Sequence, residues 1–232
     1  MVTEGVDIID VGGESTRPGA VQIGDAEEID RVAGVIELLV REFDVPISID
    51  TSKSSVAREA VAAGVDFVND ISGLKFDSAM AWVAASSGAG LFLMHTRGRP
   101  ERMQHDTSYA DLLTEVETSL RSSADQALRA GVAKDKIALD PGIGFGKDLK
   151  GNLSLVNRLD RLAGLGYPIL LGTSRKSFIG KVLQQDDPAA RLNGTLATIA
   201  LGVDRGAMLF RVHDVHPVRE AALMAWAIKN AD

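Results

Sequence analysis

The sequence predicts an α/β fold, specifically a TIM-type (β/α)8 barrel in which seven of the eight strands can be identified. Short apolar runs alternate with segments of helical spacing, and nearly every apolar run ends in a polar residue. Because tight turns cannot join parallel strands, this alternation favours a parallel sheet with helical connections. Polar ends on nearly all strands favour a barrel, whose loops converge on one site, over an open sheet, whose site needs only a few strands.

Seven apolar runs have the length and composition of buried strands. They are Ile8 to Val11, Ile47 to Asp50, Phe67 to Asp70, Leu91 to His95, Ile137 to Asp140, Ile169 to Thr173 and Met208 to His213. Helical spacing is found between most of them, and Gly64 and Gly131 are placed as helix stops. The helical segments are Ala26 to Phe43, Ser54 to Ala63, Asp111 to Ala130 and Ala189 to Arg205.

The chain is expected to form a single domain over residues 1–232. Its 232 residues, 45% of them hydrophobic, are enough to bury one substantial core. A closed barrel of this kind needs eight strands, however, and Met1 to Gly5 resembles the last turn of a helix that precedes the first strand. We therefore expect a barrel domain that is N-terminally incomplete. Long loops rich in Gly, Pro and charge are expected at Glu14 to Asp25 and Thr96 to Tyr109.

Composition argues against several classes of protein. A net charge of -7 disfavours a general surface for nucleic acid or anionic membrane. The sequence has neither an apolar run of about 18 residues nor the features of a signal peptide at its start, so we expect a cytoplasmic protein with no membrane partner. The count of zero cysteines excludes disulfides, thiolate metal sites and a cysteine nucleophile.

Two strand ends carry groups suited to reading a heterocycle. Asp50 can hold a ring N–H and an exocyclic amine in a bidentate pair, although an aspartate there can equally cap the next helix. Asn69 offers a donor and an acceptor, but Asn69-Asp70 can also be a simple turn.

A glycine-rich segment follows the strand that ends at Asp140. Three glycines let the backbone approach a ligand closely, while Asp140 and Phe145 project into the barrel mouth. Neither common nucleotide motif fits. Lys147 stands where G-x-G-x-x-G requires glycine, and a P-loop needs glycine at 141 and Ser or Thr at 148.

Cations cluster at two further strand ends. The turn Thr173-Ser174-Arg175-Lys176-Ser177 suits an anionic or carbonyl-bearing ligand, or is a solvated basic turn. Arg211 and His213 alternate on one face and suggest a phosphate, with a buried ion pair and a packed histidine as alternatives. The loop Glu14 to Gly19 offers a further hydroxyl and guanidinium suited to phosphate. His213 and His216 lack the partners of a zinc site.

Taken in order, these elements resemble those of the dihydropteroate synthase family from one end of the chain to the other. Each element alone is weak, but seven in the right order at strand ends are specific. The matching segments are Ile9 to Gly19, Asp50 to Lys53, Asn69 to Ile71, Leu93 to His95, Asp140 to Lys147, Ser174 to Ser177 and Arg211 to Asp214.

The resemblance implies a transferase of folate biosynthesis, a sulfonamide target, that joins 6-hydroxymethyl-7,8-dihydropterin diphosphate to 4-aminobenzoate with Mg²⁺. It also implies a homodimer. The catalytic residues it implies are Lys176, Arg211, His213 and Asp140. The pterin-binding residues would be Asp50, Asn69, Asp140, Lys176, Met94, Phe145 and Arg211. The diphosphate would be held by Thr16, Arg211 and His213, and the aminobenzoate by Arg17 and Ser177.

One element of the family pattern is not found in the sequence. Family members carry an earlier strand that ends in Asn-Val-Thr-Pro-Asp-Ser-Phe-Ser, whose asparagine assists Mg²⁺ and diphosphate binding, so the metal ligands here are unknown. We expect a truncated form of a longer parent. Two alternatives follow: a catalytically impaired pterin-binding fragment or accessory protein, and a methyltetrahydrofolate-binding methyltransferase domain. The cationic strand ends argue against the second, because a methyl donor has no diphosphate.

Overall fold

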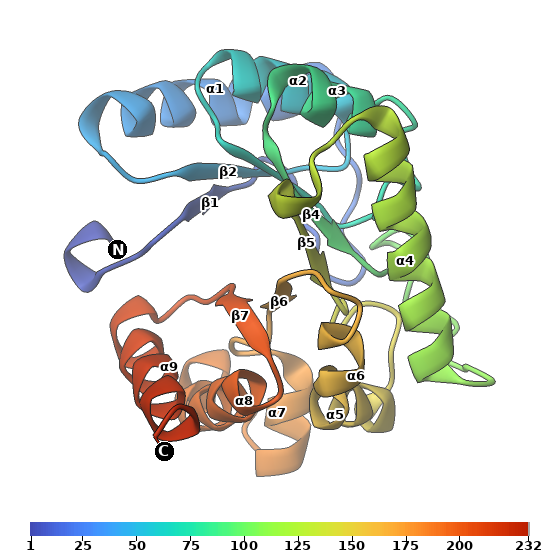
Figure 1. The fold of residues 1–232 in the computed structure, drawn as a ribbon, viewed down its shortest axis with the longest axis vertical. Coiled ribbons are helices and arrows are strands. Elements are labelled where there is room, and N and C mark those ends of the chain that lie inside the picture. Colours follow the sequence, from blue (N-terminus) through green and yellow to red (C-terminus); the bar gives the residue numbers. More distant parts are fainter. Residues whose placement is uncertain (232) are drawn as a thin grey trace.

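The computed structural model describes residues 1–231 and shows seven parallel strands curled into a barrel-like sheet, with helices on its outer side (Figure 1). The strands follow one another in chain order, so β1 and β7 lie at the two ends of that order. They are β1 (Ile9–Val11), β2 (Ile47–Asp50), β3 (Phe67–Asp70), β4 (Gly90–Met94), β5 (Ile137–Asp140), β6 (Ile169–Leu171) and β7 (Ala207–Phe210). The predicted α/β barrel architecture with seven strands is confirmed.

Helices connect successive strands. They are α1 (Asp25–Glu42), α2 (Ser54–Ala62), α3 (Met80–Ser87), α4 (Leu112–Ala130), α5 (Leu149–Asn157), α6 (Leu159–Ala163), α7 (Ser177–Leu183), α8 (Leu192–Asp204) and α9 (Val215–Lys229), with 3-10 turns η1 (Val2–Glu4), η2 (Lys134–Lys136) and η3 (Pro188–Arg191). The helix predicted from Ala189 to Arg205 is divided, because Pro188 begins a 3-10 turn capped by the Asp187 carboxylate. Among the described residues, no helix is both long enough and apolar enough to span a bilayer.

Three strands end earlier than the sequence predicted. β4 ends one residue before His95, β6 two residues before Thr173 and β7 three residues before His213. At the end of β7, a side chain replaces the neighbouring strand as the hydrogen-bond partner: the His213 backbone N–H donates to Ser174 Oγ at 3.2 Å. The predicted polar strand ends on β6 and β7 are therefore loop residues, which gives their side chains freedom to turn toward the mouth.

Two layers of apolar side chains support the sheet. The larger layer lies between the outer face and the helices and contains fully buried Ile49, Leu93 and Leu139. A smaller cluster fills the inside of the curl, where the rings of Phe67 and Phe92 stack with centroids 5.1 Å apart. Because side chains alternate along a strand, the polar residues two positions beyond this inner cluster share its face. Asp10, Asn69, Met94, Asp140 and Arg211 each follow a residue of the inner cluster by two positions, and Asp50 pairs with Asn69 in the strand register.

Candidate active site

Two carboxylates, from β1 and β2, converge on one arginine that follows β7, and an asparagine of β3 contacts one of them. Arg211 donates from Nε to Asp10 Oδ2 at 2.5 Å and from Nη2 to Asp50 Oδ2 at 2.8 Å. Asn69 Nδ2 donates to Asp10 Oδ2 at 3.2 Å. The other carboxylate oxygens, Asp10 Oδ1 and Asp50 Oδ1, are buried and have no hydrogen-bond partner among the described residues. Two acceptors are thus left for a ligand.

Burial and neighbouring charges shift the pKa values of the side chains in this cluster. Burial raises the pKa of Asp50 to about 7, against the opposing effect of Arg211 and with a further contribution from Asp10. The pKa of Arg211 is raised, since the two carboxylates outweigh its own desolvation. A donor that reaches the free Asp50 oxygen would therefore supply the partner that this buried acceptor lacks, which is a strong driving force for binding.

A second group lies on β5 and the turn after β6. Lys176 Nζ donates to the carbonyl of Ile143 and lies 4.9 Å from the centroid of the Phe145 ring. A carbon placed at Cβ of Gly172 would be 3.8 Å from Lys176 Nζ and 3.9 Å from Asp140 Oδ2, so these groups border the same space. Burial lowers the pKa of Lys176 to about 8, although Asp140 opposes the change. Burial likewise raises the pKa of Asp140.

The glycine-rich loop after β5 is held by a buried lysine that the sequence analysis did not single out as a site residue. Lys147 Nζ bonds to the carbonyls of Gly142 (2.9 Å) and Phe145 (2.8 Å) and to His95 Nδ1 (3.0 Å). Burial and the neighbouring Lys147 lower the pKa of His95 to about 2, so its neutral ring accepts from the lysine. Gly142 has φ +68°, and a Cβ there would lie 1.9 Å from the His95 carbonyl oxygen.

The two cationic residues of the β6 turn have different surroundings. Arg175 is directed away from the carboxylate cluster and forms a two-point contact with the Asp214 carboxylate, with Nε to Oδ2 at 2.9 Å. Its neighbour Ser174 contacts His213 Nδ1 at 2.9 Å. Burial lowers the pKa of His213, and Arg175 and Arg211 add to this effect.

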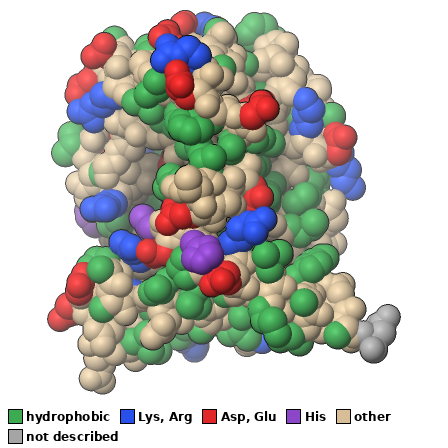
Figure 2. Space-filling view, turned by 90° about the vertical axis from the view of Figure 1, so that its left-hand side faces the viewer, with side chains coloured by type: hydrophobic (Ala, Val, Ile, Leu, Met, Phe, Trp, Pro, Cys, Tyr) green, Lys and Arg blue, Asp and Glu red, His purple; other side chains and the backbone are tan. Residues whose placement is uncertain are grey.

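The remaining predicted site residues lie around the mouth. Met94 is buried at the end of β4, and Ser177 is exposed as the first residue of α7. Thr16 and Arg17 lie in the loop between β1 and α1, where their side chains form no hydrogen bond with another described residue. Arg17 is nevertheless close enough to help lower the pKa of His213. The open side of the curl between β1 and β7 presents charged and histidine side chains across its middle (Figure 2).

Within residues 1–231, no three His, Cys, Asp or Glu side chains are grouped so as to hold a metal ion.

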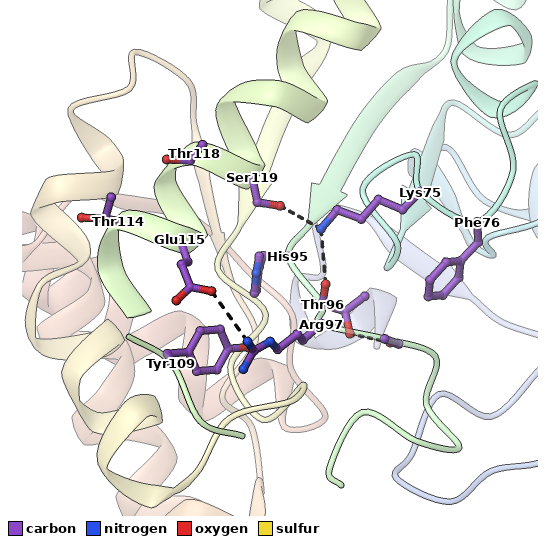
Figure 3. Close-up of a pocket in the computed structure, with 11 residues that line it drawn as sticks. Lys75, Phe76, His95, Thr96, Arg97, Tyr109, Thr114, Glu115, Thr118 and Ser119 are labelled. Carbon is purple, nitrogen blue, oxygen red and sulfur yellow. Dashed lines mark hydrogen bonds and ion pairs between the residues drawn. The ribbon is translucent and has the colours of Figure 1, made fainter. Parts of the chain in front are cut away.

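A cavity of about 460 Å³ lies outside this site, between the loop after β4 and the first turns of α4 (Figure 3). Lys75 enters it from the β3 side, with Nζ bonded to Ser119 Oγ at 2.8 Å, while Arg97 lies over the ring of Tyr109. His95 reaches it because it follows Met94 and so faces the opposite way from the inner layer. None of the predicted site residues lines this cavity.

Asp10 is the main residue of the cluster that the sequence analysis did not assign to the site. It was visible as a polar strand end, and its spacing of two from Ile8 could have placed it on the inner face. Its role as a partner of Arg211 depends on a contact between residues 201 positions apart in the sequence.

Comparison with known proteins gives one consistent answer. The family model described as "Pterin binding enzyme" matches residues 1–213. The dihydropteroate synthase of Bacillus subtilis is 49% identical over 230 residues, which cover 99% of this chain and 78% of the relative. That of Synechocystis is 46% identical over 228 residues, covering 98% and 79%.

Solved structures agree. The Clostridium difficile enzyme crystallised in the presence of pteroic acid has a TM-score of 0.93 at 48% identity, covering 99% of this chain and 85% of that one. The Yersinia pestis enzyme with a sulfonamide drug has a TM-score of 0.95 at 40% identity, covering 99% and 83%. The chain therefore belongs to the pterin-binding enzyme family, and its similarity to the dihydropteroate synthases of that family extends over almost its whole length.

Proposed function

We propose that this chain catalyses the dihydropteroate synthase reaction, in which the amine of 4-aminobenzoate displaces diphosphate from 6-hydroxymethyl-7,8-dihydropterin diphosphate. The observation that carries the proposal is the pair of buried carboxylate oxygens without partners, Asp10 Oδ1 and Asp50 Oδ1, next to a mouth that also holds Lys176, Arg211 and His213. One half of the site thus offers acceptors for a heterocycle, and the other offers cations for an anion.

The pterin would bind at the carboxylate side. A ring N–H and an exocyclic amine can donate to one carboxylate in parallel: Asp50 Oδ1 has no partner, and Oδ2 can accept a second hydrogen bond beside the one from Arg211. Asn69 and Asp140 would bind other polar atoms of the ring. Met94 and Phe145 would cover its faces, and the cation of Lys176 already lies over the Phe145 ring.

Catalysis would consist mainly of stabilising the diphosphate leaving group. The amine nitrogen forms a bond to the pterin methylene carbon while the carbon–oxygen bond to diphosphate breaks, its electron pair leaves with the diphosphate, and the amine proton passes to water. Arg211, His213 and Thr16 would stabilise the negative charge that develops on the leaving oxygen. Arg17 and Ser177 would position the aminobenzoate, which is also where we expect a sulfonamide to compete.

Mg²⁺ would enter with the substrate. The described residues offer no group of three ligands, whereas Mg²⁺ commonly binds substrate phosphates and water with few protein ligands.

We further propose that the protein acts in the cytoplasm as a homodimer. Both substrates are small soluble metabolites, which supports the first proposal. Large apolar side chains exposed on neighbouring helices α8 and α9 support the second, since such patches commonly mark interfaces. These side chains are Leu201, Leu223, Met224, Trp226 and Ile228.

The direct test is diphosphate release by the purified chain with pterin diphosphate and Mg²⁺, with and without 4-aminobenzoate. Release that requires the aromatic amine is expected. The variant Lys176→Met should lose most of it, while Lys150→Met, which removes an exposed lysine of α5, should not. Pterin diphosphate that binds without any release would instead support the binding-only alternative. Binding of methyltetrahydrofolate but not of pterin diphosphate would support the methyltransferase alternative.

A further inference from the structure

A buried lysine fastens the base of the loop that carries Thr16 and Arg17. Lys53 Nζ, just after β2, donates to Glu14 Oε2 at 2.7 Å, to the Ile23 carbonyl at 2.7 Å and to Glu28 Oε2 at 2.6 Å. Glu14 stands at the start of the loop and Ile23 at its end. The three donors of one ammonium group therefore join both ends of the loop to helix α1.

The carboxylate of Glu14 also joins the start of the loop to its end. Its Oε2 accepts the backbone N–H of Ile23 at 2.9 Å as well as the Lys53 bond. Both backbone groups of Ile23 are thus hydrogen-bonded, the N–H to Glu14 and the C=O to Lys53. Further out, one backbone hydrogen bond among the described residues joins this loop to the loop after β4, from Gly19 N–H to the Pro100 carbonyl at 3.0 Å, and the Arg99 side chain donates to Gln22 Oε1 at 3.4 Å.

This arrangement is buried and charged. Lys53 is 7% exposed and Glu28 1% exposed, and a Cβ at Gly13 would lie 2.9 Å from the Glu28 side chain. Although burial opposes its charge, the hydrogen bonds to Glu14 and Glu28 raise the pKa of Lys53. The lysine is therefore a permanent cation, and each of its three ammonium protons forms a hydrogen bond. Because these contacts are buried, solvent screens them less than it screens an ion pair on the surface.

The fastening is also connected to the pterin side of the mouth. Lys53 follows Asp50 by three residues, and its backbone N–H donates to Thr51 Oγ1 at 3.2 Å within the same turn. A second bond, from Ser55 Oγ to Asp25 Oδ2 at 2.5 Å, joins the first turns of α2 and α1 beside it. The strand end that carries Asp50 and the loop that carries Arg17 therefore share one anchor.

We infer that Lys53, acting through Glu14, is a positioning residue that sets the loop 15–22 over the mouth so that Thr16 and Arg17 reach diphosphate and aminobenzoate. Lys53 touches no reacting atom in this role. The inference rests on the proposed function for the identity of the ligands, but the fastening itself can be tested without activity.

The test compares three variants with the wild type, and uses Lys53→Arg and Lys150→Met as controls. Glu14→Gln keeps the size of the side chain but removes the negative charge that Lys53 contacts at the start of the loop. Lys53→Met removes the anchor and leaves Glu28 buried without a partner, so it is expected to lose stability. Lys53→Met combined with Glu28→Leu removes both buried charges and should recover stability, because an apolar pair of similar volume can replace a buried ion pair.

We expect the KM for 4-aminobenzoate to rise roughly tenfold or more in all three variants, given the strength of a charge-assisted hydrogen bond. The Kd for a pterin without diphosphate should stay within about twofold, because Asp50 and Asn69 are not altered. Amide hydrogen exchange of residues 15–24 should become faster in each variant. Lys53→Arg should recover part of the KM, and Lys150→Met should leave both KM and exchange as in the wild type.

Two results would overturn the inference: unchanged exchange and KM in Glu14→Gln, or a return of KM to the wild-type value when the double variant recovers stability. The second would show that Lys53 acts only through folding. If the wild type itself releases no diphosphate, the proposed function fails, while the exchange experiment still decides whether Lys53 orders the loop.

Discussion

Replacement of Asp50 by asparagine should make the unliganded protein more stable and a poorer pterin binder. Asp50 is 5% exposed, and one of its carboxylate oxygens has no partner among the described residues. Its pKa is raised from 3.8 to about 7, mainly by burial. Below that pH the folded protein favours the neutral acid, and the charged form becomes the main one, at a cost in stability, as the pH rises.

The magnitude follows from proton linkage. Because the folded pKa lies above the unfolded value, Asp50 costs no stability below pH of about 3.8, and stability is lost as the pH rises through about 7. A shift of about three pKa units corresponds to about 4 kcal/mol at higher pH. Asparagine keeps an oxygen that can accept from Arg211 and carries no charge, so it should recover much of that energy.

The assay is urea unfolding of the wild type and Asp50→Asn at intervals from pH 4 to pH 8. The difference in the free energy of unfolding between the two proteins should be small at pH 4 and grow toward pH 8. The buried carboxylates Asp70 and Asp140 also have raised pKa values, but they are present in both proteins and cancel in the difference. A difference that does not change with pH would refute the reasoning.

The same variant should bind pterin less tightly. An amide offers one acceptor and no charge, so it cannot form the bidentate charge-assisted pair with a ring N–H and an amine. We expect affinity to fall roughly 10- to 100-fold, the cost of one or two such bonds. Calorimetric titration of both proteins with a pterin measures this directly.

Three further predictions concern the cation, the glycine-rich loop and the core. Lys176 has a pKa of about 8, so kcat/KM of the wild type should fall above that pH, whereas Lys176→Met should be slower by roughly 10- to 100-fold and lack this fall; an unchanged profile would remove Lys176 from the site. Gly142→Ala should lower the free energy of unfolding by more than about 1 kcal/mol, because φ is +68° and the new Cβ would lie 1.9 Å from the His95 carbonyl oxygen; urea unfolding equal to wild type would contradict this. Leu139→Ala should cost about 2–5 kcal/mol in the same assay, and the exposed Leu153→Ala within about 0.5 kcal/mol.

The α/β architecture, the order of the strands and most of the polar residues at their ends could be predicted from the sequence. These features are local: a run of apolar residues identifies a strand, helical spacing identifies a connection, and both are written in consecutive residues. The bounds of β2, β3 and β5 were correct for this reason. The ends of β6 and β7 were placed too far along the chain, because the point where a strand loses its neighbour depends on the sheet and not on the run itself.

Which polar groups meet, in contrast, depends on the tertiary structure. Arg211 joins Asp10 and Asp50 from the other end of the chain, and Lys53 joins two carboxylates from a loop and a helix. Arg175 and Lys176 are adjacent in the sequence, yet one pairs with Asp214 and the other enters the site. The physical reason is that the curl of the sheet brings distant strand ends to one mouth, and the face on which each side chain lies then selects its partners.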